Sequence, residues 1–233
     1  MFLGTLQRYR FFILLATIVC LLGIDPLMRD FAPHATPFVS RIVIASLFVL
    51  MLLSAVLAVQ KRAWSNKLAV SLAIPLVLLE VLQVVYHWQV FTVSAHLLGG
   101  VFLVHVVVAI TAHLLVVRRV TSDLICASIC VYLLLGLMFA LVFSILESVT
   151  PGAFHVADPT ESVSMRFGSE GSSDVLYFSF VTLTTLGFGD LTPRTPTAKI
   201  LVCMEAVTGQ LFLAVLVARL VGLHIGRSVE NRD

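Results

Sequence analysis

The stretch that decides the fold runs from Tyr177 to Asp190 and reads YFSFVTLTTLGFGD. An apolar segment containing threonines leads into two glycines spaced two residues apart, and an aspartate follows. Glycine permits left-handed backbone conformations and the close approach of neighbouring chains. A single G-x-G is weak evidence, because glycines also let helices pack closely. The complete stretch, with its threonines and its aspartate, is far more specific evidence for a loop that binds an ion. The alternative interpretation is a polar re-entrant turn that binds no ion.

The rest of the chain is strongly apolar. Hydrophobic residues make up 59% of the 233 residues, charged residues make up 12%, and the mean hydropathy is +1.05. This composition excludes an ordinary water-soluble protein and indicates an all-α integral membrane protein. About 20 apolar residues cross a bilayer as a helix. We expect six transmembrane helices, near Arg10–Met28, Phe38–Val59, Leu68–Tyr86, Val93–Val117, Leu124–Leu146 and Pro196–Leu223.

A seventh apolar segment, Val175–Thr184, is too short to cross the membrane. A helix of this length spans about 15 Å, which is half of the hydrocarbon core. It immediately precedes the glycine-containing loop. We therefore expect a re-entrant helix that delivers the loop to the middle of the membrane.

The first apolar segment resembles a signal peptide, because Arg8 and Arg10 precede Phe11–Ile24. However, Asp25-Pro26 follows the segment where a cleavable signal has small residues. We therefore expect this segment to be retained as a transmembrane helix.

The basic residues predict the orientation of the six helices. If both termini are cytoplasmic, ten of the fifteen Lys and Arg residues fall on the cytoplasmic side and five on the outer side. This asymmetry follows the positive-inside rule, and it places the loop on the outer side. The cytoplasmic group is Arg8, Arg10, Lys61, Arg62, Lys67, Arg118, Arg119, Arg219, Arg227 and Arg232, and the outer group is Arg29, Arg41, Arg166, Arg194 and Lys199.

The sequence Thr185-Leu186-Gly187-Phe188-Gly189 differs at two positions from the T-V-G-Y-G filter of potassium channels. Residues 123–225 resemble the two-helix pore module of the ion-channel superfamily, and the whole chain is similar to prokaryotic six-span potassium channels. The resemblance implies two domains. Residues 1–119 would form a four-span N-terminal membrane domain. Residues 120–233 would form a pore domain with an outer helix, a pore helix, the filter and an inner helix.

The resemblance also implies the function. Backbone carbonyls replace the hydration shell of potassium in such filters. The potassium ligands would be Thr185, Leu186, Gly187 and Phe188, and Gly189 would complete the filter. A homotetramer in the lipid bilayer would conduct potassium passively, as a channel and not an enzyme, with no cofactor and no nucleic-acid partner. The alternative within channels is a poorly selective cation pore.

Five residues around the filter are expected to support it: Tyr177, Phe178, Thr182, Thr184 and Asp190. Many members of the family have tryptophans at the positions of Tyr177 and Phe178 and a tyrosine at the position of Phe188. The family alignment therefore leaves Tyr177 as the group that can donate a hydrogen bond to Asp190. Phe178 has no donor, and aromatic packing is expected there.

The last apolar helix is expected to line the pore. Gly209 matches the hinge glycine of the family, although a small residue for helix packing explains it equally well. Glu205 is costly at this depth unless it is paired, and we expect it to contact hydroxyls of the pore helix, its backbone or water. The proposed cavity face, with residues three and four apart, is Gly209, Gln210, Leu213, Val217 and Val221.

The fourth apolar segment lacks the charges of a voltage sensor. A sensor needs several Arg or Lys residues at every third position, whereas Val93–Val117 has none. It contains only His96, His105 and His113, whose spacing does not form one stripe. We therefore expect weak voltage dependence or none.

The histidines permit two other interpretations. Glu80 and His96 lie at similar depth on adjacent helices, so a buried polar pair is expected, with Arg41 as the competing partner of Glu80. Paired histidines also ligate haem iron in helical bundles. A haem-binding membrane redox protein is therefore the alternative from a different class, but it leaves the filter sequence unexplained.

Overall fold

The computed structural model describes residues 9–31, 37–59, 63–86, 89–117, 121–157, 165 and 172–230. Helices dominate this part of the chain, and it also contains two short strands. The helices are α2 (Arg10–Phe31), α3 (Pro37–Val59), α4 (Ala63–Tyr86), α5 (Gln89–Val116), α6 (Ser122–Val149), α7 (Ser172–Leu183) and α8 (Pro196–Glu230), and the strands are β1 (Phe154–Val156) and β2 (Leu191–Pro193).

Five of these helices, α3, α4, α5, α6 and α8, are long and apolar enough to cross a membrane. This agrees with an all-α, multi-pass membrane protein. In α2 the apolar part is only Arg10–Ile24, so a first transmembrane helix stays a prediction. The short apolar segment expected before the loop is helical and corresponds to α7.

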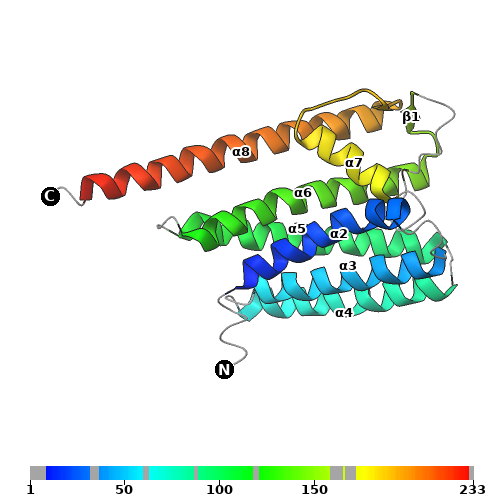
Figure 1. Ribbon diagram of the computed structural model, residues 1–233, viewed down its shortest axis with the longest axis horizontal. Coiled ribbons are helices and arrows are strands. Elements are labelled where there is room, and N and C mark those ends of the chain that lie inside the picture. Colours follow the sequence, from blue (N-terminus) through cyan, green and yellow to red (C-terminus); the bar gives the residue numbers. More distant parts are fainter. Residues whose placement is uncertain are drawn as a thin grey trace.

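The helices form two groups on either side of α6 (Figure 1). On one side, α2, α3, α4 and α5 make a bundle in which successive helices run antiparallel, and α6 packs along α2 and α5. On the other side lie α7 and α8, and α7 packs between α6 and α8 near one end of the bundle. The basic turn Arg118-Arg119, which separates the two predicted domains, lies outside the described residues.

Capping residues explain where the helices of the second group begin. The Thr121 hydroxyl accepts a hydrogen bond from the backbone nitrogen of Leu124 at 3.2 Å, at the start of α6. Thr195 does the same for Ala198 at 3.3 Å, with Pro196 as the first residue of α8. Both are favourable N-terminal signals.

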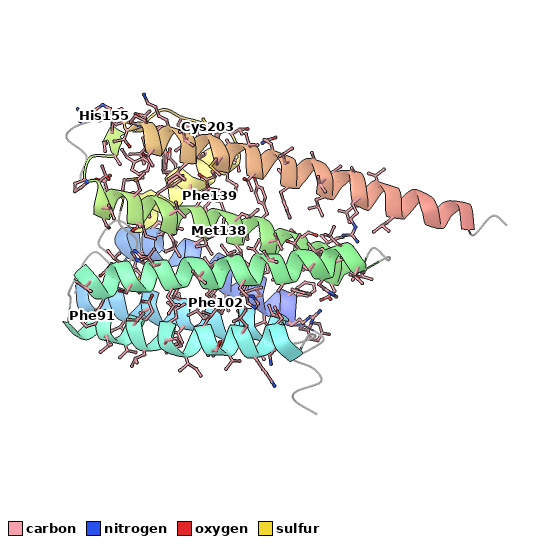
Figure 2. All side chains as sticks on the ribbon, turned by 180° about the vertical axis from the view of Figure 1, so that it is seen from behind. Phe91, Phe102, Met138, Phe139, His155 and Cys203 are labelled. Atoms are coloured by element: carbon pink, nitrogen blue, oxygen red, sulfur yellow. The ribbon has the colours of Figure 1, made fainter. Side chains whose placement is uncertain are left out.

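The interior is filled by large apolar side chains, as close packing requires. Phe11 from α2, Phe102 from α5 and Phe143 from α6 are fully buried, and Figure 2 shows Phe102 among the side chains of the N-terminal bundle. The core therefore extends from the four N-terminal helices through α6 to α7.

The last helix, α8, is different, because only 11% of its apolar span is buried, compared with 61% for α6. Its C-terminal part continues beyond the ends of the other helices (Figure 1). One face of α8 packs on α6 and α7. A largely apolar helix with so little burial presents a surface suited to lipid or to other protein chains.

Candidate functional site

The filter sequence begins where α7 ends. The Thr184 amide donates to the Phe180 carbonyl at 3.0 Å, and the Thr184 hydroxyl donates to the same oxygen at 2.7 Å. The Thr185 amide turns back to the Thr182 carbonyl at 2.9 Å. The helix therefore closes tightly, and the following residues leave it as a loop on the side of the molecule opposite the N-terminal bundle (Figure 1).

The backbone of this loop alternates in handedness. Thr185, Gly187 and Gly189 have φ angles of 58–86°, in the left-handed region. Leu186 and Phe188 between them have negative φ. The left-handed region is easy for glycine and costs energy for threonine. The two glycines therefore sit where the backbone needs them, whereas Thr185 stores strain.

Hydrogen bonds show which way the peptide groups of the loop face. The amides of Leu186 and Gly187 both donate to the Val181 carbonyl in α7, at 2.9 and 3.4 Å. In a trans peptide the amide N–H and the preceding C=O point in opposite directions, and no cis peptide is present among the described residues. The carbonyls of Thr185 and Leu186 therefore point away from α7.

This carbonyl-bearing side of the loop is open in a single chain. Thr184, Thr185 and Gly187 are exposed, and the side chains of Leu186 and Phe188 are 58% and 65% exposed. A row of outward-facing carbonyl oxygens is a site for a cation, since it supplies oxygen ligands without a net charge. One chain provides ligands from one side only.

The outer end of the loop is fixed by Asp190. The Tyr177 hydroxyl donates to Asp190 Oδ2 at 2.7 Å, and the Leu191 amide donates to Oδ1 at 3.0 Å. The Tyr177 ring also stacks on Phe188, with centroids 6.3 Å apart and an interplanar angle of 6°. The contact expected between Tyr177 and Asp190 is therefore present, and its effect on the filter stays a prediction.

A small sheet attaches the same end of the loop to the segment after α6. β1 pairs with β2 antiparallel, with His155 opposite Thr192, and the Ala157 amide donates to the backbone carbonyl of Asp190 at 2.8 Å. This pairing could not be predicted from the sequence, because both strands have only three residues.

Phe178 packs on α6 and β1. Its ring lies 5.3 Å from Phe143 of α6 and 5.3 Å from Phe154 of β1, in edge-to-face contacts. These three rings form a buried aromatic cluster behind α7. Aromatic packing was expected at Phe178, but the partners are the outer helix and strand, because Phe178 and Tyr177 occupy different faces of α7. Thr182 is also buried.

At Gly209, α8 packs closely against the last residue of α7. A Cβ atom there would collide with the backbone carbonyl oxygen and side chain of Leu183. This is the packing role expected as one explanation of this glycine, and α8 continues through it without interruption. The hinge stays a prediction.

The next residue links α8 to the filter sequence. Gln210 Nε2 donates to the Thr185 hydroxyl at 3.2 Å, a contact that the sequence did not reveal. The polar residue on an otherwise apolar helix face was the available signal. The expected cavity residues Gln210, Leu213, Val217 and Val221 are all exposed in the single chain.

Glu205 lies deep between α6, α7 and α8. Its side chain is fully buried, and Oε1 forms a hydrogen bond with the Ser179 hydroxyl of α7. The contact with a pore-helix hydroxyl is one of those expected from the sequence. The specific partner could not be foreseen, because it depends on the rotation of α8 against α7.

The expected pair of Glu80 and His96 stays a prediction. The Ser144 hydroxyl of α6 lies 3.4 Å from His96 Nδ1, because the buried face of α5 packs on α6. The side chain of Arg41, the other expected partner of Glu80, lies outside the described part of the structure.

The three histidines of α5 contact three different helices. His105 Nε2 lies 3.0 Å from the Ser65 carbonyl of α4, and His113 Nε2 lies 3.3 Å from the Arg10 guanidinium of α2. His96 contacts α6. The three imidazoles thus make different helix contacts, and no cluster of three metal-ligating side chains is found among the described residues.

Comparison with known proteins identifies a related region. Residues 131–223 match a sequence family described as "Ion channel". "Two-pore potassium channel 4" of Arabidopsis thaliana is 45% identical over 58 residues, which cover 25% of this chain and 20% of that protein. "Two pore potassium channel c" of Oryza sativa subsp. japonica is 37% identical over 68 residues, which cover 29% of this chain and 15% of that protein.

The matches thus span a fifth or less of the length of these curated relatives. No solved structure gives a significant match. The region matched by the family extends from α6 to α8, and it contains α7, the loop with alternating backbone and Gly209. The segment that holds the candidate site is therefore similar in sequence to ion channels.

Proposed function

We propose that this protein is a potassium channel in which four chains surround one axis and hold dehydrated potassium with their filter carbonyls. The observation that carries the proposal is the direction of the peptide groups. The amides of Leu186 and Gly187 bind Val181, which turns the carbonyls of Thr185 and Leu186 to the open side. The similarity of residues 131–223 to ion channels supports the same conclusion.

The need for four chains follows from coordination. A potassium ion that has lost its water requires oxygens all around it, whereas one chain presents a single row. The 233 residues contain one T-L-G-F-G segment. The low burial of α8 in one chain supports assembly, since its exposed face would pack on neighbouring copies or line the cavity.

The chain supplies ion ligands and no reaction chemistry. The proposed potassium ligands are the carbonyls of Thr185, Leu186, Gly187 and Phe188, together with the Thr185 hydroxyl at the inner end. Neutral carbonyls can hold the ion without trapping it, and permeation is passive. The proposed domains are the N-terminal membrane domain, residues 1–119, and the pore domain, residues 120–233.

The proposed location is the cell membrane, with six transmembrane helices and both termini in the cytoplasm, as the distribution of Lys and Arg indicates. The chain resembles prokaryotic channels that lack a charged sensor, because Gln89–Val116 contains no Lys or Arg. Voltage has little charge to act on in this helix.

The decisive experiment is ion flux through liposomes that contain the purified protein. Potassium and rubidium should permeate much faster than sodium, and barium should block the flux. Gly187→Ala should abolish flux, because φ is 58° there. Gly100→Ala is the matched control, because a Cβ at this position of α5 meets no atom within 4 Å.

Other results would contradict the proposal. Equal permeation of sodium and potassium would replace it with the poorly selective cation pore. A Soret absorption band in the purified protein, without flux, would favour the haem protein. A mass other than four subunits in detergent would refute the tetramer.

A further inference from the structure

A chain of buried polar groups joins three helices behind the filter. Glu205 of α8 and Ser179 of α7 both have 0% exposure. The Ser179 hydroxyl lies within hydrogen-bond distance of Glu205 Oε1, and it lies 2.7 Å from the backbone carbonyl of Gly136 in α6. Neither the carbonyl of Gly136 nor the carboxyl of Glu205 belongs to the row of filter carbonyls.

The number of hydrogen atoms available to these three polar groups indicates the charge state of Glu205. A serine hydroxyl carries one hydrogen, yet Ser179 faces two oxygen acceptors. If Glu205 were a carboxylate, Ser179 could donate to only one of them, and two oxygens without a proton would remain in contact. A proton on Glu205 removes the conflict, because Glu205 then donates to Ser179 and Ser179 donates to Gly136.

The surroundings of Glu205 favour the same charge state. The second carboxyl oxygen, Oε2, is buried and has no hydrogen-bond partner among the described residues. The titratable group that faces it from α6 is Tyr132, whose hydroxyl donates to the Leu183 carbonyl at 3.4 Å. No ion pair involving Glu205 is found in the described part of the chain, and an unpaired carboxylate at this depth is very costly.

We propose that Glu205 is a neutral carboxylic acid at neutral pH, and that it positions α7 through a hydrogen-bond relay from Glu205 to Ser179 to the Gly136 carbonyl. The relay fastens the middle of α7 to α6 and α8. Its charge state can be tested without any assumption about ion flux. Its effect on conduction rests on the proposed channel function, since α7 carries the filter.

Close packing at the same three helices explains why this geometry is precise. A Cβ at Gly136 would overlap the Phe180 ring at 2.7 Å, so α6 and α7 touch closely where the relay crosses between them. Gly209 similarly brings α8 against Leu183. The two glycines thus set the helix separations that the relay spans.

Infrared difference spectroscopy tests the charge state. The spectrum of Glu205→Gln subtracted from that of the parent protein should contain the carbonyl stretch of a protonated carboxyl group, shifted by deuteration. Ser179→Ala should keep this band but move it, because the acid loses its acceptor. Ser128→Ala is the matched control, since that buried hydroxyl donates within its own helix to Leu124 at 2.8 Å. Carboxylate bands that are present in the parent protein and absent from Glu205→Gln would overturn the proposal.

Assembly and flux test the positioning role. Glu205→Gln should behave like the parent protein, because its amide donates to Ser179 without adding charge. Glu205→Met has no donor, and it should lower the assembled fraction or the flux about tenfold, the effect of one lost hydrogen bond. Glu80→Gln in α4 controls for replacing a membrane carboxyl. If Glu205→Gln were as damaging as Glu205→Met, the neutral relay would be refuted.

Discussion

The Tyr177 hydroxyl donates a hydrogen bond to Asp190 Oδ2 at 2.7 Å, and it thereby joins α7 to the end of the loop that follows it. The same tyrosine stacks on Phe188. One side chain of α7 thus contacts two residues of the loop. Asp190 in turn receives the Leu191 amide and, through its backbone carbonyl, the Ala157 amide, so the outer end of the loop is held from two directions.

The first prediction concerns this hydrogen bond. Tyr177→Phe and Asp190→Asn should each accelerate the loss of conduction during sustained flux or at low potassium. A hydrogen bond to a charged group contributes about 1.5–3 kcal/mol, which is enough to shift a loop between conducting and collapsed states. The rate of current decay in lipid bilayers is the measurement.

A double-mutant cycle distinguishes a direct interaction between Tyr177 and Asp190 from two independent effects. The current of the double variant should decay more slowly than the sum of the two single effects predicts, because either substitution removes the same bond. Tyr9→Phe, at an exposed position before α2, is the matched control. Additive effects, or current in Tyr177→Phe that persists as in the parent, would contradict the bracing role.

Some helix boundaries could be predicted closely because the membrane fixes the length of an apolar helix, whereas α8 ends at Glu230, seven residues beyond the expected Leu223. The expected segment Phe38–Val59 and the observed α3, Pro37–Val59, differ by one residue. The positive φ angles at Gly187 and Gly189 could also be expected from residue type. Thr185 could not, because threonine avoids this region and adopts it only where the surrounding hydrogen bonds require it.

Contacts between helices were harder to predict than helices. The contact of His96 with Ser144 could not be predicted, because the rotation of α5 against α6 decides which side chains meet. Aromatic packing was expected at Phe178, but its partners Phe143 and Phe154 could not be identified from the sequence. A sequence without an alignment of relatives contains little information about such rotations.

The second prediction concerns the buried aromatic cluster of Phe143, Phe154 and Phe178. Phe143→Ala should destabilise the assembled protein by about 3–5 kcal/mol, because the substitution leaves a cavity and removes the contacts of the Phe143 ring with both α7 and β1. Thermal dissociation of the purified oligomer measures this loss. Phe12→Ala, at a position 46% exposed on α2, should have a small effect. Equal stability of the two variants would show that the cluster does not support the pore helix.

The third prediction concerns voltage. One charge that crosses the membrane field gains about 2.3 kcal/mol per 100 mV, and α5 has no Lys or Arg to supply such charges. Open probability should therefore change little with voltage in planar bilayers. Neutralising Arg118 and Arg119 should alter insertion or expression more than the voltage response. Gating charges of several units per channel would contradict this prediction.

The last prediction distinguishes packing from hinge motion at Gly209. Gly209→Ala should destabilise the oligomer by about 1–3 kcal/mol, because the added methyl group collides with the Leu183 backbone oxygen as well as its side chain. Leu183→Ala should give only partial rescue, since the carbonyl remains. Gly222→Ala in the same helix is the control, because its Cβ meets no atom within 4 Å. Normal assembly of Gly209→Ala, combined with loss of channel opening, would instead favour the hinge.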